Sequence, residues 1–391
     1  MSQESLEGAY YSAENTDMRN RWYPFVMGTS LAKGAVQGHH ILGDPIVLYR
    51  DPENGEPIAL ADKCAHRSAP LSVGRMMDGR LECRYHGWQF DGSGICTKIP
   101  SNAKIPGNAK VRKYPMVEAE NFLWIWPGDL DRVKDVPSPK IYYPKENPDW
   151  VPRVGVEVLD IDASLLCENF LDPAHIPFTH ENTIGKRSNA TLMSITCEFV
   201  DKIALGLGVG ISGVVSTPER PDLGVNNDRK FEFYGPCLVS LDFGPMGDQT
   251  FYSVPTRKGH CHFIYIQRFS FLQFLEKNFL GKMMMDWQGP AYTKKILMED
   301  YAMLKGQQER LAAGANAMNS PVAADKMIKM YRNWWRKVMR REDGGPWFKG
   351  YSEDMEDILL DDLSLGKARI ANGSGARSTV ISKRNNERGD E

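Results

Sequence analysis

Two short loops, each carrying one cysteine and one histidine, constrain this chain more than any other feature of its sequence. The stretch CAHRSAPLSVGRMMDGRLECRYHGWQF contains Cys64-x-His66 and, after sixteen intervening residues, Cys83-x-x-His86. Each loop offers one thiolate and one imidazole, and the segment between the loops has the length of a hairpin. Both groups are common metal ligands, and four of them at this spacing rarely coincide by chance. The sequence therefore predicts a metal centre held between two loops.

Two kinds of metal centre use two cysteines and two histidines. Zinc modules usually pair Cys with Cys on one loop and His with His on the other. Here each loop is mixed, which favours a Rieske [2Fe-2S] cluster, where two thiolates bind one iron and two imidazoles bind the other. The predicted cluster ligands are Cys64, His66, Cys83 and His86. A zinc site remains the alternative at this point.

A second group of ligand-type side chains follows further along the chain. The stretch LLCENFLDPAHIPFTHENTIG places Asp172, His175 and His180 within nine residues. Two histidines and one carboxylate that leave coordination positions open form the triad that binds oxygen-activating ferrous iron. We predict His175 and His180 as two ligands of a mononuclear iron, and Asp300 as the third, with Glu299 in reserve. A hydrogen-bonded pair of core histidines is the alternative.

The distribution of Gly, Pro and charge divides the chain into two domains and a tail. Short apolar or alternating runs broken by Gly, Pro and Asp predict an antiparallel β domain over 20–130. A linker rich in Pro and charge, about 128–152, marks the boundary to a second predicted domain, 131–365, of strands followed by helices. The expected helical stretches are 164–182, 271–287, 290–313 and 324–340. The polar Gly/Ser-rich tail, 366–391, is predicted to be disordered.

Composition excludes several classes of protein. A charged fraction of 25 % and a hydrophobic fraction of 42 % are typical of soluble globular chains, and a net charge of −2 gives no reason to expect nucleic acid as a partner. No apolar run reaches the roughly 18 residues of a membrane span, and the first thirty residues lack a secretory pattern. The odd number of seven cysteines argues for a reducing compartment.

The Phe- and Met-rich stretch 269–287 is expected to pack as an amphipathic helix, or else to touch a membrane surface peripherally.

Taken together, the two groups of residues resemble the signature of Rieske non-haem iron oxygenases. The matching motifs are Cys64-x-His66, Cys83-x-x-His86-Gly87-Trp88 and Glu168-x3-Asp172-x2-His175-x4-His180. The later stretch GQQERLAAGANAMNSPVAADKMIKMYRNWWRKV is similar to the branch that includes chlorophyllide a oxygenase and pheophorbide a oxygenase. The resemblance covers about residues 20–345. Two positions depart from it: Arg84 stands where relatives often have Pro, and Glu168 where they tend to have Asp.

The resemblance implies a fold, cofactors and partners. The implied fold is an N-terminal all-β Rieske [2Fe-2S] domain followed by an α+β helix-grip catalytic domain that holds a mononuclear non-haem Fe(II). Asp172 would link a cluster histidine to His175, usually across a subunit boundary in a homotrimer. A ferredoxin or similar reductase would supply electrons for reaction of O2 with a hydrophobic ring substrate, a tetrapyrrole such as chlorophyllide a, whose ring methyl would become a formyl group.

The same resemblance bears on location and leaves alternatives. In a photosynthetic eukaryote the protein would lie in the chloroplast, at the thylakoid surface, and otherwise in the cytoplasm. One alternative keeps both irons and changes the ring substrate to a pheophorbide, an aromatic compound or a sterol. Another is a Rieske protein that only transfers electrons, which would contain no mononuclear iron.

Overall fold

The computed structural model describes residues 1–147, 149–217, 229–270 and 279–340, and every structural statement below concerns those residues. The predicted tail and residues 341–365 of the predicted second domain lie outside them. The described strands form four antiparallel sheets, three of them small and one of seven strands. None of the described helices combines the length and the apolar character needed to cross a bilayer.

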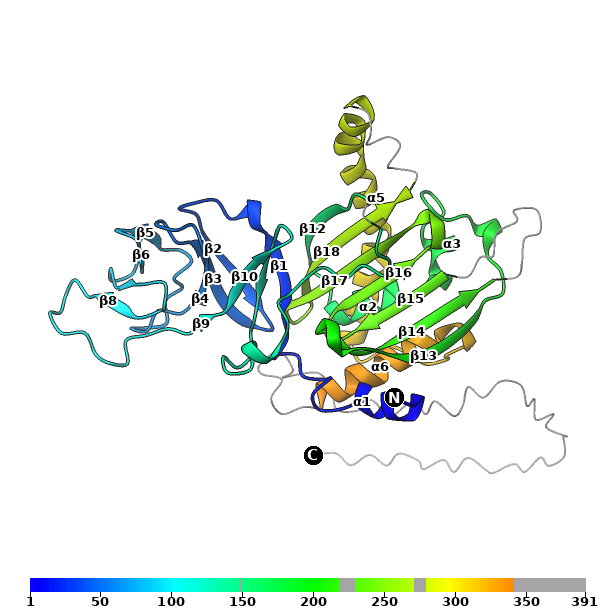
Figure 1. The fold of residues 1–391 in the computed structure, drawn as a ribbon, viewed down its shortest axis with the longest axis horizontal. Helices are drawn as coiled ribbons and strands as arrows, with labels where there is room; N and C mark the ends of the chain where they lie inside the picture. The colour runs from blue at the N-terminus through cyan, green and yellow to red at the C-terminus, as the bar shows by residue number, and fades with distance from the viewer. Residues whose placement is uncertain (148, 218–228, 271–278, 341–391) are drawn as a thin grey trace, which may run out of the picture. The chain divides into compact units, whose positions relative to one another are not determined.

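The N-terminal part consists of short antiparallel strands, as the broken apolar runs predict (Figure 1). The sheet orders are β1-β11-β10, β2-β3-β4-β9 and β5-β6-β7-β8. The strands are β1 (Tyr23–Met27), β2 (Val36–Ile41), β3 (Asp44–Arg50), β4 (Pro57–Ala61), β5 (Arg75–Met77), β6 (Arg80–Glu82), β7 (Gln89–Phe90), β8 (Cys96–Lys98), β9 (Lys113–Tyr114), β10 (Met116–Ala119) and β11 (Phe122–Ile125). Cys64 and Cys83 lie in the apolar core of this part, beside Leu60, Leu81 and Phe90.

Two-residue turns set the register of three hairpins in this part. Ile41 pairs with Asp44, so Leu42 and Gly43 alone connect β2 to β3, with φ angles of 49° and 81°. Asp78-Gly79 connects β5 to β6 and Glu120-Asn121 connects β10 to β11, again with positive φ at both positions. Turns of this kind match the twist of the flanking strands, and each requires residues that tolerate left-handed backbone angles.

The second part is a seven-stranded sheet with helices on one face, in the order β12-β18-β17-β16-β15-β14-β13. Its strands are β12 (Arg153–Leu159), β13 (Ser194–Lys202), β14 (Gly208–Ser216), β15 (Arg229–Tyr234), β16 (Leu238–Asp242), β17 (Gly247–Arg257) and β18 (His260–Phe269). The helices of the described chain are α1 (Gln3–Tyr10), α2 (Ala163–Phe170), α3 (Ile176–Thr179), α5 (Phe279–Ala312) and α6 (Lys326–Met339). This architecture confirms the predicted α+β class with an all-β N-terminal part.

Strand pairing aligns one residue from each of the seven strands into a single row across the sheet. The row is Cys197, Gly213, Phe231, Leu241, Gln249, Gln267 and Arg153. A Cβ added at Gly213 would lie 2.2 Å from Sδ of Met327, so α6 sits directly on this face at β14. Phe233, two residues along β15 and therefore on the same face, contacts the rings of Tyr331 and Trp334 of α6. Helix α6 thus covers this face at β14 and at Phe233 of β15, and leaves the rest of the face free to line a cavity.

The predicted helix boundary at residues 287–290 is wrong. Helix α5 runs without interruption from Phe279 to Ala312, through Gly289 and Pro290, whereas the sequence pattern predicts two helices there. Leu297, Asp300 and Leu304 of α5 are buried, and tertiary packing of this kind overrides a local breaking signal. Residues 271–278 of the stretch predicted as amphipathic, with its membrane alternative, lie outside the described residues.

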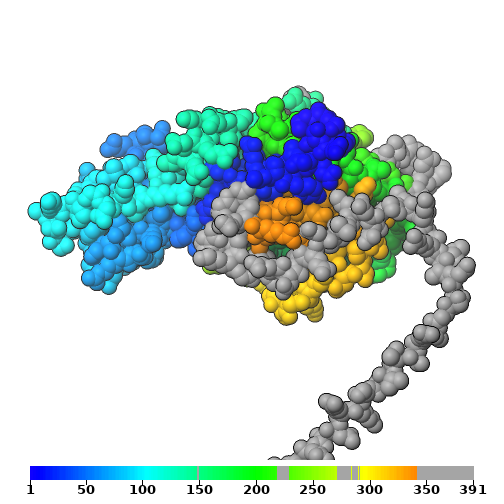
Figure 2. Space-filling view, turned by 90° about the horizontal axis from the view of Figure 1, so that it is seen from below, coloured from blue at the N-terminus to red at the C-terminus, as the bar shows by residue number. Residues whose placement is uncertain are grey.

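The N-terminal residues pack on the large sheet, which the sequence pattern does not predict. The side-chain amide of Gln3 both accepts from and donates to the backbone of Phe199, at 2.9 and 3.1 Å. Asn15 forms the same two bonds with the backbone of Val209, at 3.1 and 2.9 Å. Each amide side chain therefore replaces a missing strand neighbour, because a primary amide matches the donor and acceptor of a peptide group. Figure 2 shows these N-terminal residues beside α6.

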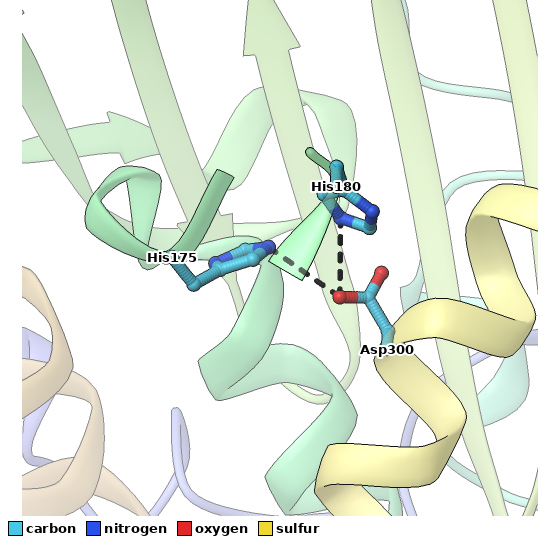
Figure 3. Close-up of side chains that lie close together, drawn as sticks. All are labelled: His175, His180 and Asp300. Carbon is cyan, nitrogen blue, oxygen red and sulfur yellow. Dashed lines mark ion pairs between the residues drawn. The ribbon is translucent and has the colours of Figure 1, made fainter. Parts of the chain in front are cut away.

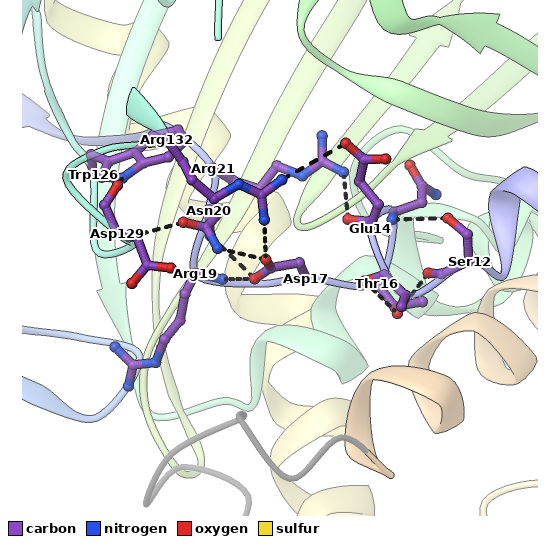
Figure 4. Close-up of polar contacts among 12 residues, drawn as sticks. Ser12, Glu14, Thr16, Asp17, Arg19, Asn20, Arg21, Trp126, Asp129 and Arg132 are labelled. Atoms are coloured by element: carbon purple, nitrogen blue, oxygen red, sulfur yellow. Dashed lines mark hydrogen bonds and ion pairs between the residues drawn. The ribbon is translucent and has the colours of Figure 1, made fainter. Parts of the chain in front are cut away.

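A polar network ties this N-terminal segment to the residues that follow β11 (Figure 4). Asp17 accepts hydrogen bonds from the Arg19 backbone and the Asn20 amide, at 2.9 and 2.7 Å. Asn20 in turn accepts from the backbone of Asp129 at 2.9 Å, and Arg132 lies 3.6 Å from the Asp17 carboxylate. The network fixes the start of the linker against the entry into β1.

The β2–β3 hairpin and β1 contact the large sheet directly. The backbone N–H groups of Leu42 and Gly43 donate to the carbonyls of Pro255 and Thr256 at 3.0 and 2.7 Å. His262 of β18 lies against Phe25 of β1, with Nδ1 at 3.2 Å from the Phe25 carbonyl. The junction buries His262 beside His39, with their ring centroids 5.8 Å apart.

The burial of His39 in this junction predicts an acid sensitivity. Burial, together with the neighbouring His262 and His40, lowers the pKa of His39 to about 4. A histidine whose pKa is lowered in the folded state stays neutral in the folded protein, whereas the same histidine in the unfolded chain takes up a proton as the pH falls. The contribution of His39 to the free energy of unfolding is therefore fully present above about pH 6.5 and decreases below it. We expect a loss of about 1–2 kcal/mol in unfolding free energy between about pH 6.5 and pH 5. His39→Gln should flatten this slope in urea unfolding, and an unchanged slope in His39→Gln would contradict the assignment.

Candidate metal centres and pocket

The two Cys/His loops form the same pattern of backbone hydrogen bonds around their cysteines. The four pairs are Cys64 N to Ala69 O, Ser68 N to Cys64 O, Cys83 N to Trp88 O and Gly87 N to Cys83 O, all at 2.8–2.9 Å. Ser68 and Gly87 occupy equivalent places with φ angles of 57° and 70°. The two loops therefore present their cysteines in the same way, and the left-handed position explains the glycine of the second loop.

The four predicted ligands meet between these loops. The thiols of Cys64 and Cys83 are buried and adjacent, and burial together with the neighbouring thiol raises the pKa of Cys64 to about 11. The Nδ1 atoms of His66 and His86 face each other at 3.2 Å, and the Trp88 ring stacks on His66 with centroids 4.7 Å apart. Two inner thiols and two outer imidazoles fit a cluster whose inner iron is thiolate-bound and whose outer iron is imidazole-bound.

A second site forms where α5 passes the segment after α2 (Figure 3). Nε2 of His175 lies 3.5 Å from Oδ1 of Asp300, and Nε2 of His180 lies 3.2 Å from the same oxygen. The ligand atoms of the three side chains all lie within 4.8 Å of one another. Only 3 % of the His180 side chain and 5 % of the Asp300 side chain are exposed. Two histidines and one carboxylate in this arrangement match the predicted triad.

The protonation pattern around His180 indicates that a cation belongs between these groups. Nδ1 of His180 lies 2.9 Å from Oε2 of Glu299, so this nitrogen carries the proton and donates it to the carboxylate. In the neutral ring Nε2 then presents a lone pair to an oxygen of Asp300, and two acceptors repel each other. Burial lowers the pKa of His180, but Asp300 and Glu299 outweigh burial and raise it overall. A metal ion relieves the same conflict, so the residues fit a bound cation.

Two further side chains hold the ligands in place. Glu299, the reserve ligand of the sequence prediction, lies on the far nitrogen of His180 and also accepts a hydrogen bond from Oγ1 of Thr183 at 2.6 Å. The amide of Asn169 donates to Oδ1 of Asp300 at 3.3 Å. Sequence reasoning missed Asn169; its position beside Glu168 in the motif is the signal that could have identified it.

Removing the carboxylate charge at Glu299 should weaken metal binding without removing a ligand. Partners that orient a ligating histidine typically change metal affinity by about 10–100-fold when they are replaced. We expect Glu299→Gln to raise the dissociation constant of the His175/His180/Asp300 site for Fe(II) or Co(II) by about tenfold. Competition with a chromophoric chelator measures this constant. Glu309→Gln, at an exposed position of the same helix, is the matched control, and equal affinities in the two variants would contradict the role of Glu299.

Asp172 stands at the edge of this site. Its Oδ1 caps the following turn by accepting from the Ala174 backbone at 2.8 Å, and Oδ2 lies 3.9 Å from Nδ1 of His175. The side chain is 28 % exposed, and His175 Nδ1 has no hydrogen-bond partner among the described residues. One helical turn earlier, Glu168, whose side chain is 12 % exposed, forms an ion pair with Arg332 of α6. Asp172 is therefore the carboxylate placed to receive the free ring N–H of His175.

A cavity of about 1060 Å³ extends from the His175/His180/Asp300 group between α5 and the large sheet. Its aromatic lining residues are Phe170, Phe231, Phe243, Phe251, Phe263, Tyr265, Phe269 and Tyr292. Phe170 stacks on Phe251 and Phe263 with ring centroids 4.2 and 5.2 Å apart, which closes the cavity beside Asn169. This volume lies at the upper end of the range of about 300–1000 Å³ for small-molecule sites, and the lining suits a large apolar ring compound.

Comparisons with known proteins agree with this arrangement. The family model described as the Rieske [2Fe-2S] domain matches residues 21–115, and that of the vanillate O-demethylase oxygenase C-terminal domain matches residues 159–341. The two matches define a Rieske protein with an oxygenase domain. The chain belongs to the Rieske non-haem iron oxygenases, a family that uses a [2Fe-2S] cluster and a mononuclear non-haem iron. The comparisons thereby confirm the predicted family, fold class and cofactors. The match to an oxygenase domain argues against a zinc site and against a Rieske protein that only transfers electrons.

Individual relatives come from plastids and from bacteria. A chloroplastic chlorophyllide a oxygenase of Chlamydomonas reinhardtii is 30 % identical over 81 % of this chain, and an Arabidopsis thaliana counterpart is 30 % identical over 84 %. The chain spans only 48 % and 59 % of their respective lengths. The toluene-4-sulfonate monooxygenase iron-sulfur subunit of Comamonas testosteroni is 26 % identical and is covered over 99 % of its length.

Solved structures support the fold. Pseudomonas putida CBB5 NdmA with caffeine superposes with a TM-score of 0.64 and 24 % identity, over 88 % of this chain and 96 % of that one. Dicamba monooxygenase bound to dicamba superposes with a TM-score of 0.60 and 23 % identity, over 82 % of this chain and 97 % of that one. At these identities the likeness concerns the fold alone.

Proposed function

We propose that this chain is a monooxygenase that uses O2 and electrons from a ferredoxin or similar reductase to oxygenate a chlorophyll-type tetrapyrrole. The preferred reaction is conversion of a ring methyl of chlorophyllide a into a formyl group. The observation that carries this proposal is the cavity of about 1060 Å³, lined by aromatic rings and ending at His175, His180 and Asp300. The similarity to chlorophyllide a oxygenases supports it.

Each group of side chains has a role in this proposal. The cluster would be held by Cys64, His66, Cys83 and His86. His175, His180 and Asp300 would hold the mononuclear Fe(II). When bound, the two centres supply electrons one at a time and activate O2 beside the cavity. Asp172, whose Oδ2 lies 3.9 Å from Nδ1 of His175, would accept the ring N–H of His175 and orient that ring.

The surrounding side chains position the substrate and exclude water. Phe170, Phe251 and Phe263 stack on one another next to the iron ligands, so they present flat apolar surfaces to a planar ring. An apolar lining keeps water away from the reacting carbon, which limits side reactions. Asn169 holds Asp300 in place and leaves the cavity side of the site open.

The proposed reaction balances over two rounds of the same chemistry. Each round consumes one O2, two electrons and two protons, breaks one C–H bond of the methyl group, forms one C–O bond and releases one water. The second round yields a carbon with two hydroxyl groups, which loses water to give the aldehyde. The electrons come from the ferredoxin-type donor in both rounds.

Assembly and location belong to the same proposal. The 28 % exposure of Asp172 suits a carboxylate shared with a cluster histidine of a neighbouring copy, as in a homotrimer. Plastid relatives favour a chloroplast location in a photosynthetic host.

Turnover of chlorophyllide a tests the proposal. Purified protein carrying both iron centres is incubated aerobically with chlorophyllide a, ferredoxin and its reductase, and the products are read by mass spectrometry. The first expected product is heavier than chlorophyllide a by one oxygen, and the second by the mass difference between a methyl and a formyl group. His175→Ala should abolish both products. Absence of product with a reducible cluster and an occupied mononuclear site would overturn the tetrapyrrole assignment.

A small aromatic substrate is the second candidate. The similarity to the toluene-4-sulfonate monooxygenase iron-sulfur subunit of Comamonas testosteroni, 26 % identical, supports it. The cavity volume argues against so small a ring. Turnover of toluene-4-sulfonate in the same assay, without turnover of chlorophyllide a, would establish this candidate instead.

A further inference from the structure

The segment that carries the two Cys/His loops is strongly basic. From Asp62 to Lys113 it contains ten Lys and Arg residues and four Asp and Glu residues, a net charge of +6 in a chain whose net charge is −2. All ten basic residues are exposed. An excess of this kind produces a positive potential over the part of the surface that contains the predicted cluster ligands.

The acidic residues of this segment are mostly engaged within the domain. Asp62 accepts hydrogen bonds from the backbone and the hydroxyl of Ser72 at 2.7 and 2.6 Å. Glu82 forms an ion pair with Arg75 at 2.9 Å. Asp91 accepts two backbone hydrogen bonds within its own turn at 2.9 and 3.1 Å. These three residues are half-buried, and only the fourth acidic residue, in the β5–β6 turn, is exposed, so the surface itself stays positive.

Two of the cations belong to the loops that present the cluster histidines. Arg67 follows His66 directly, and Arg84 precedes His86 by two residues. Both arginines are exposed, and no ion pair within the described chain engages either side chain. Because the Nδ1 atoms of the two histidines lie 3.2 Å apart, the two loops meet at this point, and both arginines belong to the same region of the surface.

An exposed aromatic ring lies against one of the two histidines. Tyr85 is 63 % exposed, and its ring centroid lies 4.0 Å from that of His86. The segment after β8 runs beside the same loop, since a Cβ added at Gly87 would lie 3.0 Å from Cγ of Pro100, and it contributes the exposed Lys104. Exposed aromatic and Arg side chains are typical of surfaces that bind another protein. We refer to four exposed residues as the basic surface: Arg67, Arg84, Tyr85 and Lys104.

The charge of this region indicates the kind of partner that it fits. Permanent interfaces between subunits are more apolar and are depleted in charged side chains at their core. A region with ten exposed cations suits instead a short-lived contact that is guided by charge. A protein that delivers electrons must bind, transfer its electron and leave. A carrier rich in Asp and Glu would complement this charge and bind in that way.

We propose that the basic surface is the docking site of an acidic one-electron carrier protein of the ferredoxin type. Each encounter passes one electron from the reduced carrier to the cluster, and the oxidised carrier then dissociates. This inference rests on the proposed function for the kind of donor and is independent of the ring substrate. It assigns a role in donor recognition to Arg84, which stands where relatives often have Pro.

Reduction of the cluster in the absence of substrate tests the proposal. The holoenzyme is mixed with a reduced plant-type ferredoxin, which is acidic, and separately with the photoreduced radical of deazariboflavin, which is small and uncharged. The visible absorbance of the cluster follows both reactions. The rate constant with ferredoxin should fall at least about tenfold from about 20 mM to about 500 mM salt, whereas the rate constant with the radical should stay constant.

Variants with reversed charge assign this effect to the basic surface. At low salt, Arg67→Glu/Arg84→Glu should slow reduction by ferredoxin about tenfold and raise the dissociation constant of oxidised ferredoxin by a similar factor. An unchanged rate with the radical shows that the cluster is intact. Arg67→Lys/Arg84→Lys should keep most of the wild-type rate with ferredoxin. Lys134→Glu, the matched control at an exposed position of the linker, should keep all of it.

Several outcomes would overturn the inference. One is an equal rate with ferredoxin in the wild type and in Arg67→Glu/Arg84→Glu, and another is equal slowing in Lys134→Glu. If Arg67→Glu/Arg84→Glu does not assemble its cluster, Arg67→Gln/Arg84→Gln provides the same comparison. Unchanged reduction by ferredoxin, combined with slower reoxidation of the cluster by O2 and substrate, would assign the surface to a neighbouring copy of this chain and overturn the donor site.

The test separates this inference from the proposed function. A wild type that the radical reduces and ferredoxin does not would overturn the docking site. A single turnover of the pre-reduced protein with chlorophyllide a needs no donor, so its result is independent of the basic surface. Salt-dependent reduction by ferredoxin without turnover of chlorophyllide a would retain the docking site and overturn the tetrapyrrole.

Discussion

Replacing Asp300 by alanine is expected to abolish turnover while leaving the cluster in place. The variant loses the only carboxylate that contacts both His175 and His180, at 3.5 and 3.2 Å, among the described residues. Two neutral imidazoles alone bind ferrous iron weakly. The purified variant should therefore lose the mononuclear iron, which is about one of every three irons, and keep the two irons of the cluster. Activity should fall at least about 1000-fold, equivalent to about 4 kcal/mol in the barrier.

Iron analysis and the visible spectrum of the cluster measure the two centres separately. Glu309→Ala, at an exposed position of α5, is the control for a change of the same kind on the same helix. Retention of all the iron in Asp300→Ala, with an unchanged rate, would show that Asp300 is no ligand. Loss of the cluster spectrum would instead indicate general unfolding.

Replacing Asp172 by asparagine is expected to slow turnover by about 100-fold with both iron centres occupied. The substitution preserves size but removes the negative charge that lies 3.9 Å from Nδ1 of His175. A neutral amide orients the ring and stabilises its N–H less well than a carboxylate does. If this carboxylate also connects the two centres, the step that slows is electron arrival at the mononuclear site, not reduction of the cluster by the donor.

Stopped-flow reoxidation of the reduced cluster, triggered by O2 and substrate, separates these steps. In Asp172→Asn, reduction by ferredoxin should keep its rate and reoxidation should slow by the same factor as turnover. Asp160→Asn, at an exposed carboxylate, is the control. Reoxidation at the wild-type rate in Asp172→Asn would exclude Asp172 from the electron path.

Local spacing was sufficient to group the candidate ligands that lie close together in the sequence. Cys64 and His66 belong to one loop, Cys83 and His86 to another, and backbone hydrogen bonds within each loop position them. Two-residue turns such as Asp78-Gly79 are equally local, since both residues adopt positive φ. Such features depend on neighbours in the chain and can be recognised without knowing the fold.

Features that depend on the pairing of distant segments could not be predicted. Arg153 lies beside Gln267 because β12 pairs with β18 in that register, and no local pattern specifies the register. Glu299 and Asp300 are adjacent in sequence, yet only the position of α5 decides which of them faces His175. The packing of Gln3 and Asn15 on the large sheet is likewise invisible in an N-terminal stretch without apolar periodicity.

A single turnover of the pre-reduced protein with chlorophyllide a and isotope-labelled O2 tests the proposed activity most directly. Because no donor protein is needed, the result depends only on the two iron centres and the cavity of this chain. The proposal predicts a hydroxylated pigment that carries the label, in an amount limited by the reduced cluster, and none in His175→Ala. Cluster oxidation without labelled pigment, in protein with both centres occupied, would contradict it.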